Sequence, residues 1–329
     1  MASNPLTLLA DVGGTHARLA LSKGNGPPGP AHVYATADYP CFTDLVRHFV
    51  TTEAAGLSIA RAAACVAGPI SDGVIRLTNL GWTIGCDELA ASGAAKILIV
   101  NDFTAIAAAL PALGGADLRA CGGGNAHPDG SRVVLGPGTG LGVSALLPDR
   151  RGGHIALAGE GGHADLAAHG ARERAVCERL AERFGRVSVE RVLSGPGIVN
   201  LYRALRELDG GCAEEAPDPA AIAASARAGQ DPHAVACVTL FTRWLGAWAG
   251  DLALSFGARG GVYIAGGIVP AWGPDFDIAG FRAAFEAKGR FEDYLVAIPC
   301  YVIDAPNPGL SGLAELLAGR VTAIESLQR

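Results

Sequence analysis

The sequence predicts an α/β protein with two domains, on three observations. The chain has 329 residues, which suits two ordinary domains better than one. Apolar runs of strand length alternate with glycine turns and helical stretches, as in proteins built from strand–helix units. A strand, a glycine turn and a second strand open each half of the chain, which indicates an internal repeat.

In the first half, two strand-like runs flank the turn Gly13-Gly14-Thr15 and predict a hairpin. An apolar run at residues 96–100 predicts a short buried strand, and the helix after it ends at Pro111. The strands expected in this half are residues 6–12, 16–22, 31–35, 61–67, 74–78 and 96–100, and the helices are residues 42–53 and 104–110.

A glycine-rich stretch, residues 114–131, is interpreted as the connection between the domains. The pattern of strand, glycine turn and strand then returns at residues 132–147. In this half we expect strands at residues 132–135, 141–147, 262–265 and 296–303, and helices at residues 172–184, 197–208, 232–256 and 310–319.

The bulk composition excludes several functional classes. With 26 basic and 32 acidic side chains the net charge is −6, whereas a nucleic-acid-binding protein needs a basic face. No apolar run approaches the roughly 18 residues of a membrane span, and no basic residues precede the short apolar run at the N-terminus, as they would in a secretory signal. We therefore expect a cytoplasmic protein with neither a nucleic-acid nor a membrane partner.

The eight cysteines are spread along the chain without a Cys-x-x-Cys pair. In a chain of this length that spacing predicts reduced, mostly buried thiols rather than disulfides. It also argues against structural zinc, because zinc ligands normally come in close pairs.

The first glycine turn, Asp11-Val12-Gly13-Gly14-Thr15, has the composition of a phosphate-binding loop. Two adjacent glycines let backbone N–H groups approach and surround an anion, and Thr15 adds a hydroxyl donor. Asp11 ends the strand, where its carboxylate can hold a magnesium ion through water. The alternative is a plain hairpin turn, for which Gly-Gly is common.

The second turn, Gly136-Pro137-Gly138-Thr139-Gly140-Leu141-Gly142, repeats this composition in the other half of the chain. No Gly-Lys-Ser/Thr follows, so it is not a P-loop, and its glycines do not fit the Gly-x-Gly-x-x-Gly spacing of dinucleotide-binding folds. Two glycine–threonine hairpins, one in each half, favour a clamp that holds a phosphate chain between two domains.

Asn101 and Asp102 directly follow the buried strand at residues 96–100. In α/β folds the carboxyl ends of strands carry the functional site, and a carboxylate there can take the proton from an attacking hydroxyl. The alternative is that Asp102 is the N-cap of the helix at residues 104–110. The substitution Asp102→Asn separates the two, because asparagine caps about as well as aspartate but is no base.

Three further segments have more than one interpretation. Glu160 and His163 enclose two glycines, which argues against a metal site on a rigid helix and leaves a loop that hydrogen-bonds hydroxyl groups, or an exposed polar loop. Glu190 fits the outward position of an alternating strand. Gly266-Gly267 either supports an adenosine or forms a tight turn between strand and helix.

Together, and in this order, these motifs resemble the bacterial glucokinase family. Each motif is short, but six in register are specific, and they cover nearly the whole chain. They are Leu9-Ala10-Asp11-Val12-Gly13-Gly14-Thr15, Val100-Asn101-Asp102-Phe103, Gly136-Pro137-Gly138-Thr139-Gly140-Leu141-Gly142, Gly159-Glu160-Gly161-Gly162-His163, Glu190-Arg191-Val192-Leu193-Ser194-Gly195 and Ala265-Gly266-Gly267-Ile268.

The resemblance implies the two-domain actin-like ATPase fold of sugar kinases, an α/β fold with a ribonuclease-H-like core in each domain and a cleft between them. In that family the last helix returns to the first domain, which implies a small domain of residues 1–112 with 306–329 and a large domain of residues 113–305. The implied activity is ATP-dependent phosphorylation of D-glucose at the 6-hydroxyl, which yields glucose 6-phosphate and ADP. The resemblance also implies a homodimer.

Carried over residue by residue, the resemblance makes Asp102 the general base on the 6-hydroxyl. It assigns sugar binding to Asn101, Asp102, Gly140, Glu160, His163 and Glu190. The turns at residues 11–15 and 138–140 hold the phosphates, and Asp11 holds Mg²⁺ through water. The residues assigned to ATP are Ala10, Asp11, Val12, Gly13, Gly14, Thr15, Gly138, Thr139, Gly266 and Gly267, of which the last two lie by the adenosine.

The sequence departs from the family pattern at His16, where members often have asparagine, and this leaves the role of position 16 open. The clustered cysteines and zinc-binding histidine motif of the repressor-type sugar kinases are not found, and we expect no DNA-binding helix-turn-helix before Asp11. Both features favour the glucokinase branch. The alternatives are a kinase of another hexose or aminosugar and a non-catalytic sugar-sensing regulator.

Overall fold

The computed structural model describes residues 6–77, 79–211 and 216–329. The chain divides into two compact units: unit 1 comprises Met1–Leu118, Ser144–Ala158 and Ala305–Arg329, and unit 2 comprises Arg119–Val143 and Gly159–Asp304. Residues 144–158 belong to unit 1, although the predicted boundaries place them in the second domain. The alternation of strands and helices is confirmed, so the chain is an α/β protein.

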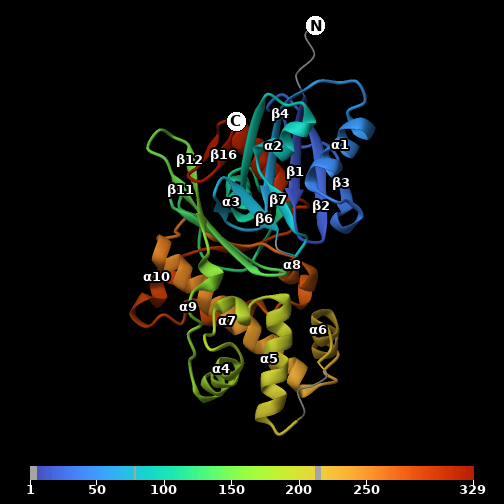
Figure 1. Ribbon diagram of the computed structural model, residues 1–329. Coiled ribbons are helices and arrows are strands. Elements are labelled where there is room, and N and C mark those ends of the chain that lie inside the picture. The colour runs from blue at the N-terminus through green and yellow to red at the C-terminus, as the bar shows by residue number, and fades with distance from the viewer. Residues whose placement is uncertain (1–5, 78, 212–215) are drawn as a thin grey trace. The chain divides into compact units, whose positions relative to one another are not determined.

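Unit 1 is built on a six-stranded sheet with the order β16-β8-β4-β1-β2-β3 (Figure 1). β1, β4 and β8 are parallel neighbours, and the predicted antiparallel hairpin of β1 and β2 is confirmed. The strands of this sheet are β1 (Leu6–Val12), β2 (His16–Lys23), β3 (His32–Ala35), β4 (Ile59–Val66), β8 (Lys96–Asn101) and β16 (Leu327–Gln328). A smaller sheet contains β5 (Ile70–Ser71), β6 (Val74–Leu77) and β7 (Trp82–Ile84), and the helices are α1 (Phe42–Glu53), α2 (Cys86–Leu89), α3 (Asp102–Ala109) and α11 (Pro308–Leu317).

One face of the six-stranded sheet packs against α1. Successive residues of a strand point to opposite sides, so Leu8, Ala10 and Val12 of β1 share this face. They are fully buried in one core with Phe42 and Phe49 of α1. Burying each large apolar side chain contributes about 1.5–3 kcal/mol, so this core holds α1 onto the sheet.

The opposite face is covered by α3 and α11. Asp11, which alternates with the core residues of β1, points to this face, where Gly309 of α11 lies beside it. α11 and α3 approach so closely that a Cβ on Gly312 would lie 1.7 Å from the carbonyl oxygen of Ala105. The C-terminal segment therefore completes the unit that the N-terminal strands begin.

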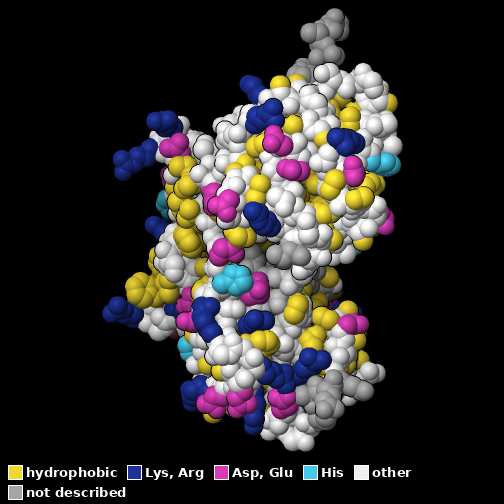
Figure 2. Space-filling view, viewed as in Figure 1, with side chains coloured by type: hydrophobic (Ala, Val, Ile, Leu, Met, Phe, Trp, Pro, Cys, Tyr) yellow, Lys and Arg dark blue, Asp and Glu magenta, His cyan; other side chains and the backbone are white. Residues whose placement is uncertain are grey.

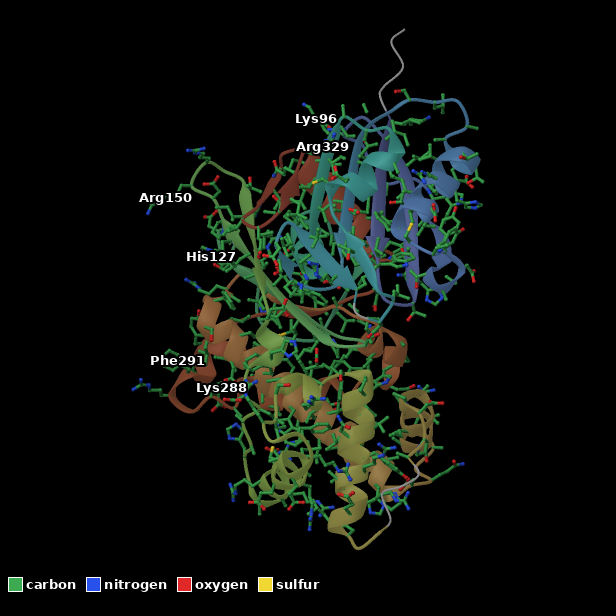
Figure 3. The ribbon with its side chains drawn as sticks, in the orientation of Figure 1. Lys96, His127, Arg150, Lys288, Phe291 and Arg329 are labelled. Atoms are coloured by element: carbon green, nitrogen blue, oxygen red, sulfur yellow. The ribbon has the colours of Figure 1, made fainter. Side chains whose placement is uncertain are left out.

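The end of the chain also joins the edge of this sheet. Ile97 and Arg329 exchange backbone hydrogen bonds of 2.9 and 3.2 Å, and Figure 3 shows Arg329 next to Lys96 at the start of β8. Arg150, in the turn between β11 and β12, points away from the ribbon in the same view.

Unit 2 holds the parallel strands β10, β13 and β14, which belong to a seven-stranded sheet with the order β15-β12-β11-β10-β13-β14-β9. Its longest helix is α7, which α5, α6 and α9 contact (Figure 1). The strands of the seven-stranded sheet are β9 (Leu118–Ala120), β10 (Arg132–Pro137), β11 (Leu141–Pro148), β12 (His154–Gly159), β13 (Val262–Ile264), β14 (Cys300–Ile303) and β15 (Val321–Ala323). The helices of unit 2 are α4 (Ala171–Phe184), α5 (Gly195–Leu208), α6 (Pro219–Arg227), α7 (Pro232–Phe256), α8 (Ile268–Trp272), α9 (Ile278–Glu286) and α10 (Glu292–Val296).

The structure corrects some predicted elements. The strand expected at residues 296–303 is only Cys300–Ile303, because residues 292–296 form α10 and Pro299 has no N–H for a longer ladder. The connection at residues 114–131 contains the short strand β9, and the helices α6 and α9 were not expected. Residue 78, the expected end of the strand at 74–78, lies outside the described residues.

The thiols agree with the compositional expectation of reduced cysteines. Figure 2 shows lysine and arginine interspersed with aspartate and glutamate on the visible face of each unit. The seven cysteines among the described residues are free thiols, and Cys212 lies outside those residues. Every helix within the described ranges is too short or too polar to cross a membrane.

Candidate active site

The carboxyl ends of β1, β4 and β8 form one row at the same edge of the unit 1 sheet. The parallel register pairs Val12 with Val66 and Val66 with Asn101. The turn after β1 and the residues after β8 therefore leave the sheet at the same edge, where open α/β sheets bind ligands. This register brings together the two segments of unit 1 that the sequence singles out, residues 11–15 and residues 101–102.

The turn between β1 and β2 exposes its tip, with Gly14 and Thr15 open to solvent. The Gly13 N–H donates to the carbonyl oxygen of His16 at 3.0 Å, and a Cβ on Gly13 would lie 3.3 Å from that oxygen. A Cβ on Gly14 would meet only the side-chain nitrogen of Asn79, at 3.8 Å. The hairpin itself therefore confines Gly13 but leaves room at Gly14.

The Asp11 carboxylate lies just below this turn and is half-buried. Its cross-strand neighbours are Arg18 on β2 and Cys65 on β4. Burial raises the pKa of Asp11 above its usual 3.8, while the Arg18 guanidinium and a hydrogen bond with the Cys65 thiol act in the opposite direction. A Cβ on Gly309 would lie 3.4 Å from the Asp11 carboxyl carbon and 3.1 Å from the Cys65 sulfur, so the α11 backbone closes over both groups.

Asn101 and Asp102 form the N-terminus of α3. Asn101 is the N-cap: its Oδ1 accepts the N–H groups of Phe103 at 2.9 Å and Thr104 at 3.2 Å. Its Nδ2 donates to the carbonyl oxygen of Gly68 at 3.1 Å, which fixes the orientation of the amide.

The suggestion that Asp102 caps a helix starting at residue 104 is therefore wrong. Asp102 is the first residue of α3, and its Oδ1 accepts the Phe103 N–H at 2.9 Å. The cap is Asn101, because it is the residue with extended backbone geometry that precedes the helix. Asp102 stays partly exposed at the sheet edge, where its carboxylate is within reach of a ligand.

In unit 2, hydrogen bonds hold both ends of the glycine turn between β10 and β11. The Gly138 N–H donates to the carbonyl oxygen of Gly140, and the Gly195 N–H at the start of α5 donates to that of Gly138, each at 2.8 Å. The Leu141 N–H donates to Oε2 of Glu190, also at 2.8 Å.

Glu190 is not on a strand, contrary to the alternating pattern around it. It lies in the 3₁₀ turn Val189–Arg191. The Ser194 hydroxyl donates to the Glu190 carbonyl oxygen at 2.8 Å and also accepts the Gly197 N–H to cap α5, so the chain has to turn here. The turn directs the carboxylate of Glu190 toward the glycine turn.

Glu160 and His163 flank the two glycines of a 3₁₀ turn, Gly161–His163, that follows β12. A Cβ on Gly162 would lie 2.1 Å from the carbonyl oxygen of Leu141, so only glycine lets this turn lie against β11. The segment is neither an α-helix nor an isolated loop, and its glycines are needed for packing.

Leu141 joins the predicted site segments of unit 2, and sequence reasoning gave it no role. Its N–H is held by Glu190, and its carbonyl oxygen contacts Gly162. The Val189 N–H donates to the carbonyl oxygen of Ala164 at 2.9 Å, which ties the two 3₁₀ turns to each other. The signal in the sequence is a strand residue between two glycines, which is typical of close backbone contact.

Gly266 and Gly267 follow β13 at the same sheet edge as the turn after β10. Gly266 has a left-handed backbone, φ +79°, and a Cβ there would lie 2.3 Å from the carbonyl oxygen of Pro137. Gly266 is therefore required by the fold. A Cβ on Gly267 would meet nothing within 4 Å, and its backbone nitrogen is 4.0 Å from the Cβ position of Gly138.

The predicted site residues thus form two groups. Unit 1 brings together the residues of the first turn with Asn101 and Asp102, and unit 2 brings together the second turn with the segments at residues 160–163, 190 and 266–267. Cys65 and Gly309, which touch Asp11, were missed, because residues so distant in sequence become neighbours only through the fold.

The donor set of unit 1 fits a magnesium ion held through water. Among the described residues, no three or more histidine, cysteine, aspartate or glutamate side chains are grouped as a metal cage. Mg²⁺ does not need one, because it usually keeps several waters and binds through one or two carboxylates and the substrate phosphates. Asp11, at the base of the first glycine turn, is a carboxylate that could serve in this way.

The comparisons with known proteins agree among themselves. A family model described as Glucokinase matches residues 8–320. The chain is 44% identical over 313 residues to a glucokinase of Chromobacterium violaceum, covering 94% of this chain and 89% of that protein. It is 44% identical over 316 residues to a glucokinase of Aromatoleum aromaticum, covering 94% of each. The fold is similar to the crystal structure of a glucokinase from an Antarctic psychrotroph, with a TM-score of 0.84, 33% identity, and coverage of 95% of this chain and 99% of that one.

Proposed function

This chain belongs to the glucokinase family, and on that premise we propose that it transfers the γ-phosphoryl group of ATP to the 6-hydroxyl of D-glucose. The products are glucose 6-phosphate and ADP. The proposed fold is the actin-like arrangement of sugar kinases, with domains of residues 1–112 with 306–329 and of 113–305.

The observation that best supports the proposal is the open space around the Cβ positions of three glycines, Gly14, Gly138 and Gly267. None has a left-handed backbone that would demand glycine. Among the described residues beyond its chain neighbours, the nearest atom to a Cβ would be 3.8 Å away at Gly14, 4.0 Å at Gly138 and beyond 4 Å at Gly267. The fold does not require glycine at these positions, whereas a phosphate chain that approaches backbone N–H groups does.

Asp102 is the proposed general base. Phosphoryl transfer needs little covalent help, so the protein acts mainly by positioning and by neutralising charge. Asp102 orients the sugar's 6-hydroxyl and accepts its proton. Asn101 fixes the start of α3, on which Asp102 lies, through its hydrogen bonds to Phe103, Thr104 and Gly68. Asp11 would hold Mg²⁺ through water, and the ion would supply positive charge at the phosphates.

The remaining polar residues are proposed to recognise the sugar. Asn101, Glu160, His163 and Glu190 present amide, carboxylate and imidazole groups suited to hydroxyls, and Gly140 lies against Glu190. Thr15 and Thr139 add hydroxyl donors to the two phosphate turns, in which Ala10, Val12 and Gly13 supply the backbone, and Gly266 with Gly267 lies by the adenosine. We also propose that the protein is cytoplasmic and forms a homodimer, and light scattering on the purified protein tests the dimer directly.

A coupled assay on glucose, mannose, fructose and N-acetylglucosamine tests the function. We expect glucose to be the preferred acceptor. The variant Asp102→Asn should lose about 10²–10⁴-fold in rate as a missing base does, with unchanged thermal stability because Asn101 is the cap. Equal rates on all four sugars would contradict glucose specificity, preference for another sugar would favour another hexose or aminosugar kinase, and binding without turnover would favour a sugar-sensing regulator.

The substitution Gly138→Ala tests the role of the open glycines, with Gly114→Ala as a matched control. Like Gly138, Gly114 has no left-handed backbone and has open space at its Cβ position, but it lies outside both turns. We expect Gly138→Ala to weaken ATP binding by about tenfold, as a steric cost near 1.4 kcal/mol would, and Gly114→Ala to change neither binding nor stability. Wild-type ATP affinity in Gly138→Ala would show that no phosphate approaches this turn.

A further inference from the structure

The carboxylate of Glu190 is hydrogen-bonded to the second glycine turn. Its Oε2 accepts the Leu141 N–H at 2.8 Å, at the point where the turn ends and β11 begins. A hydrogen bond to a charged acceptor is stronger than one between neutral groups. The other oxygen, Oε1, accepts no hydrogen bond from the residues that the structure describes.

Gly140 is a glycine because of this carboxylate. Its backbone is not left-handed, so the local conformation admits any residue. A Cβ at position 140 would nevertheless lie 2.6 Å from Oε2 of Glu190 and 3.4 Å from its carboxyl carbon, and Glu190 is the only close neighbour among the described residues. Alanine at this position would therefore push the carboxylate away from the Leu141 N–H.

Gly138 and Gly140 lie in the same turn, but each is a glycine for a different reason. At Gly138 the nearest described atom is 4.0 Å from the Cβ position, so the fold leaves the space open. At Gly140 the space is filled by a side chain from a segment about fifty residues away in the sequence. The first glycine fits a ligand that approaches from outside, and the second fits a contact within the protein.

From these contacts we infer that Glu190 is a positioning residue for the phosphate-binding turn, in addition to its proposed part in sugar recognition. One carboxylate oxygen holds the end of the turn, and the other is left to accept a sugar hydroxyl. The inference rests on the proposed function, in which this turn holds phosphates. Through this hydrogen bond, a sugar that orders Glu190 would also order the turn, and because linkage is reciprocal the sugar and the nucleotide would then raise each other's affinity by the same factor.

The test measures nucleotide binding without sugar, so that it does not depend on turnover. Isothermal titration with a non-hydrolysable ATP analogue and Mg²⁺ compares the wild type with Glu190→Gln and Glu190→Ala. Glutamine keeps an oxygen that can accept the Leu141 N–H, whereas alanine does not. We expect Glu190→Ala to bind the analogue about tenfold more weakly, and Glu190→Gln to stay within about threefold of the wild type.

Gly140→Ala supplies a second, independent arm. Alone it should weaken analogue binding about as much as Glu190→Ala, because it displaces the same carboxylate. In the Glu190→Ala background it should add nothing, because the group that it displaces is gone, and this non-additivity is the signature of direct coupling. Hydrogen exchange of the Leu141 amide should be faster in Glu190→Ala than in Glu190→Gln.

Two outcomes would overturn the inference. If Glu190→Ala binds the analogue like the wild type and only its KM for glucose rises, Glu190 serves the sugar alone. If Gln and Ala lose affinity equally while the Leu141 amide exchanges as in the wild type, the effect is not through the turn. Should Glu190→Ala not fold, analogue binding by Gly140→Ala, with Glu190→Gln as its control, decides between the same outcomes. A wild type that binds no analogue and phosphorylates no glucose would instead refute the proposed function.

Discussion

At the scale of single residues, Asp11 opposes folding at neutral pH. Burial raises the pKa of its carboxyl group above 3.8. A group whose pKa is higher in the folded than in the unfolded state contributes stability that is complete below the unfolded-state pKa and is lost as the pH rises through the folded-state pKa. Such an unfavourable charge is typical of a side chain kept for a ligand.

Replacing Asp11 with asparagine should therefore raise stability while it removes activity. Asparagine keeps an oxygen for the Cys65 thiol but has no charge to bury, so the free energy of unfolding should exceed that of the wild type at pH 7. The advantage should shrink as the pH falls toward 4, because the wild-type carboxyl then becomes neutral. Urea unfolding of both proteins from pH 4.5 to 7.5 gives the comparison. A variant that is less stable than the wild type at pH 7 would show that the carboxylate is a structural group.

The residues around Asp11 show how far sequence reasoning reaches at this scale. Asp11 and its glycines are found because they adjoin each other in one motif. Cys65 and Gly309 touch the same carboxylate, but nothing in their local sequence indicates it. The segments that carry Asp11, Cys65 and Gly309 are far apart in the chain, and only the strand order and the packing of α11 bring them together.

At the scale of elements, the N-terminus of α3 depends on Asn101. Its Oδ1 satisfies two N–H groups of the first turn, and its Nδ2 ties the helix start to Gly68. We predict that Asn101→Ala lowers the free energy of unfolding by about 0.5–2 kcal/mol, as the loss of an N-cap does.

The matched control is Asn101→Ser, which keeps a capping oxygen and should be the more stable of the two. Both variants lose the contact with Gly68, so both should lower kcat through misplacement of Asp102. Equal denaturation midpoints for the alanine and serine variants would mean that the cap does not contribute to stability.

Two other elements mark the limit of pattern reading. Strand β8 was expected from its apolar run and is confirmed. Both of its faces are buried, and a strand that is buried on both faces needs a continuous run of apolar residues. The alternation around Glu190 was misleading, since capping of α5 by Ser194 forces a turn there. Periodicity over seven residues cannot reveal such a competing local hydrogen bond.

At the scale of the whole molecule, the residues proposed to hold ATP and glucose belong to two units. The resemblance implies a cleft between two domains, and we propose that closure of this cleft on the sugar excludes water, so water should be a poor acceptor until a sugar is bound. We predict that ATP hydrolysis without sugar is much slower than transfer to glucose. Release of ADP and of phosphate, followed with and without glucose, measures both rates.

D-xylose is the natural control for this prediction. It resembles glucose but lacks the carbon that carries the 6-hydroxyl, so it can order the sugar site without accepting the phosphoryl group. We expect it to stimulate hydrolysis. Hydrolysis without any sugar that is as fast as transfer would contradict closure.

The return of α11 to the first strands has a consequence for how the protein is made. The hairpin that carries Asp11 is synthesised well before Gly309, which closes over Asp11, and Gly312, which packs on α3. Unit 2 lies between them in the chain and can assemble first. During synthesis the turn after β1 is therefore made well before α11, and the contacts of Asp11 are complete only when α11 has been made and has packed on the sheet.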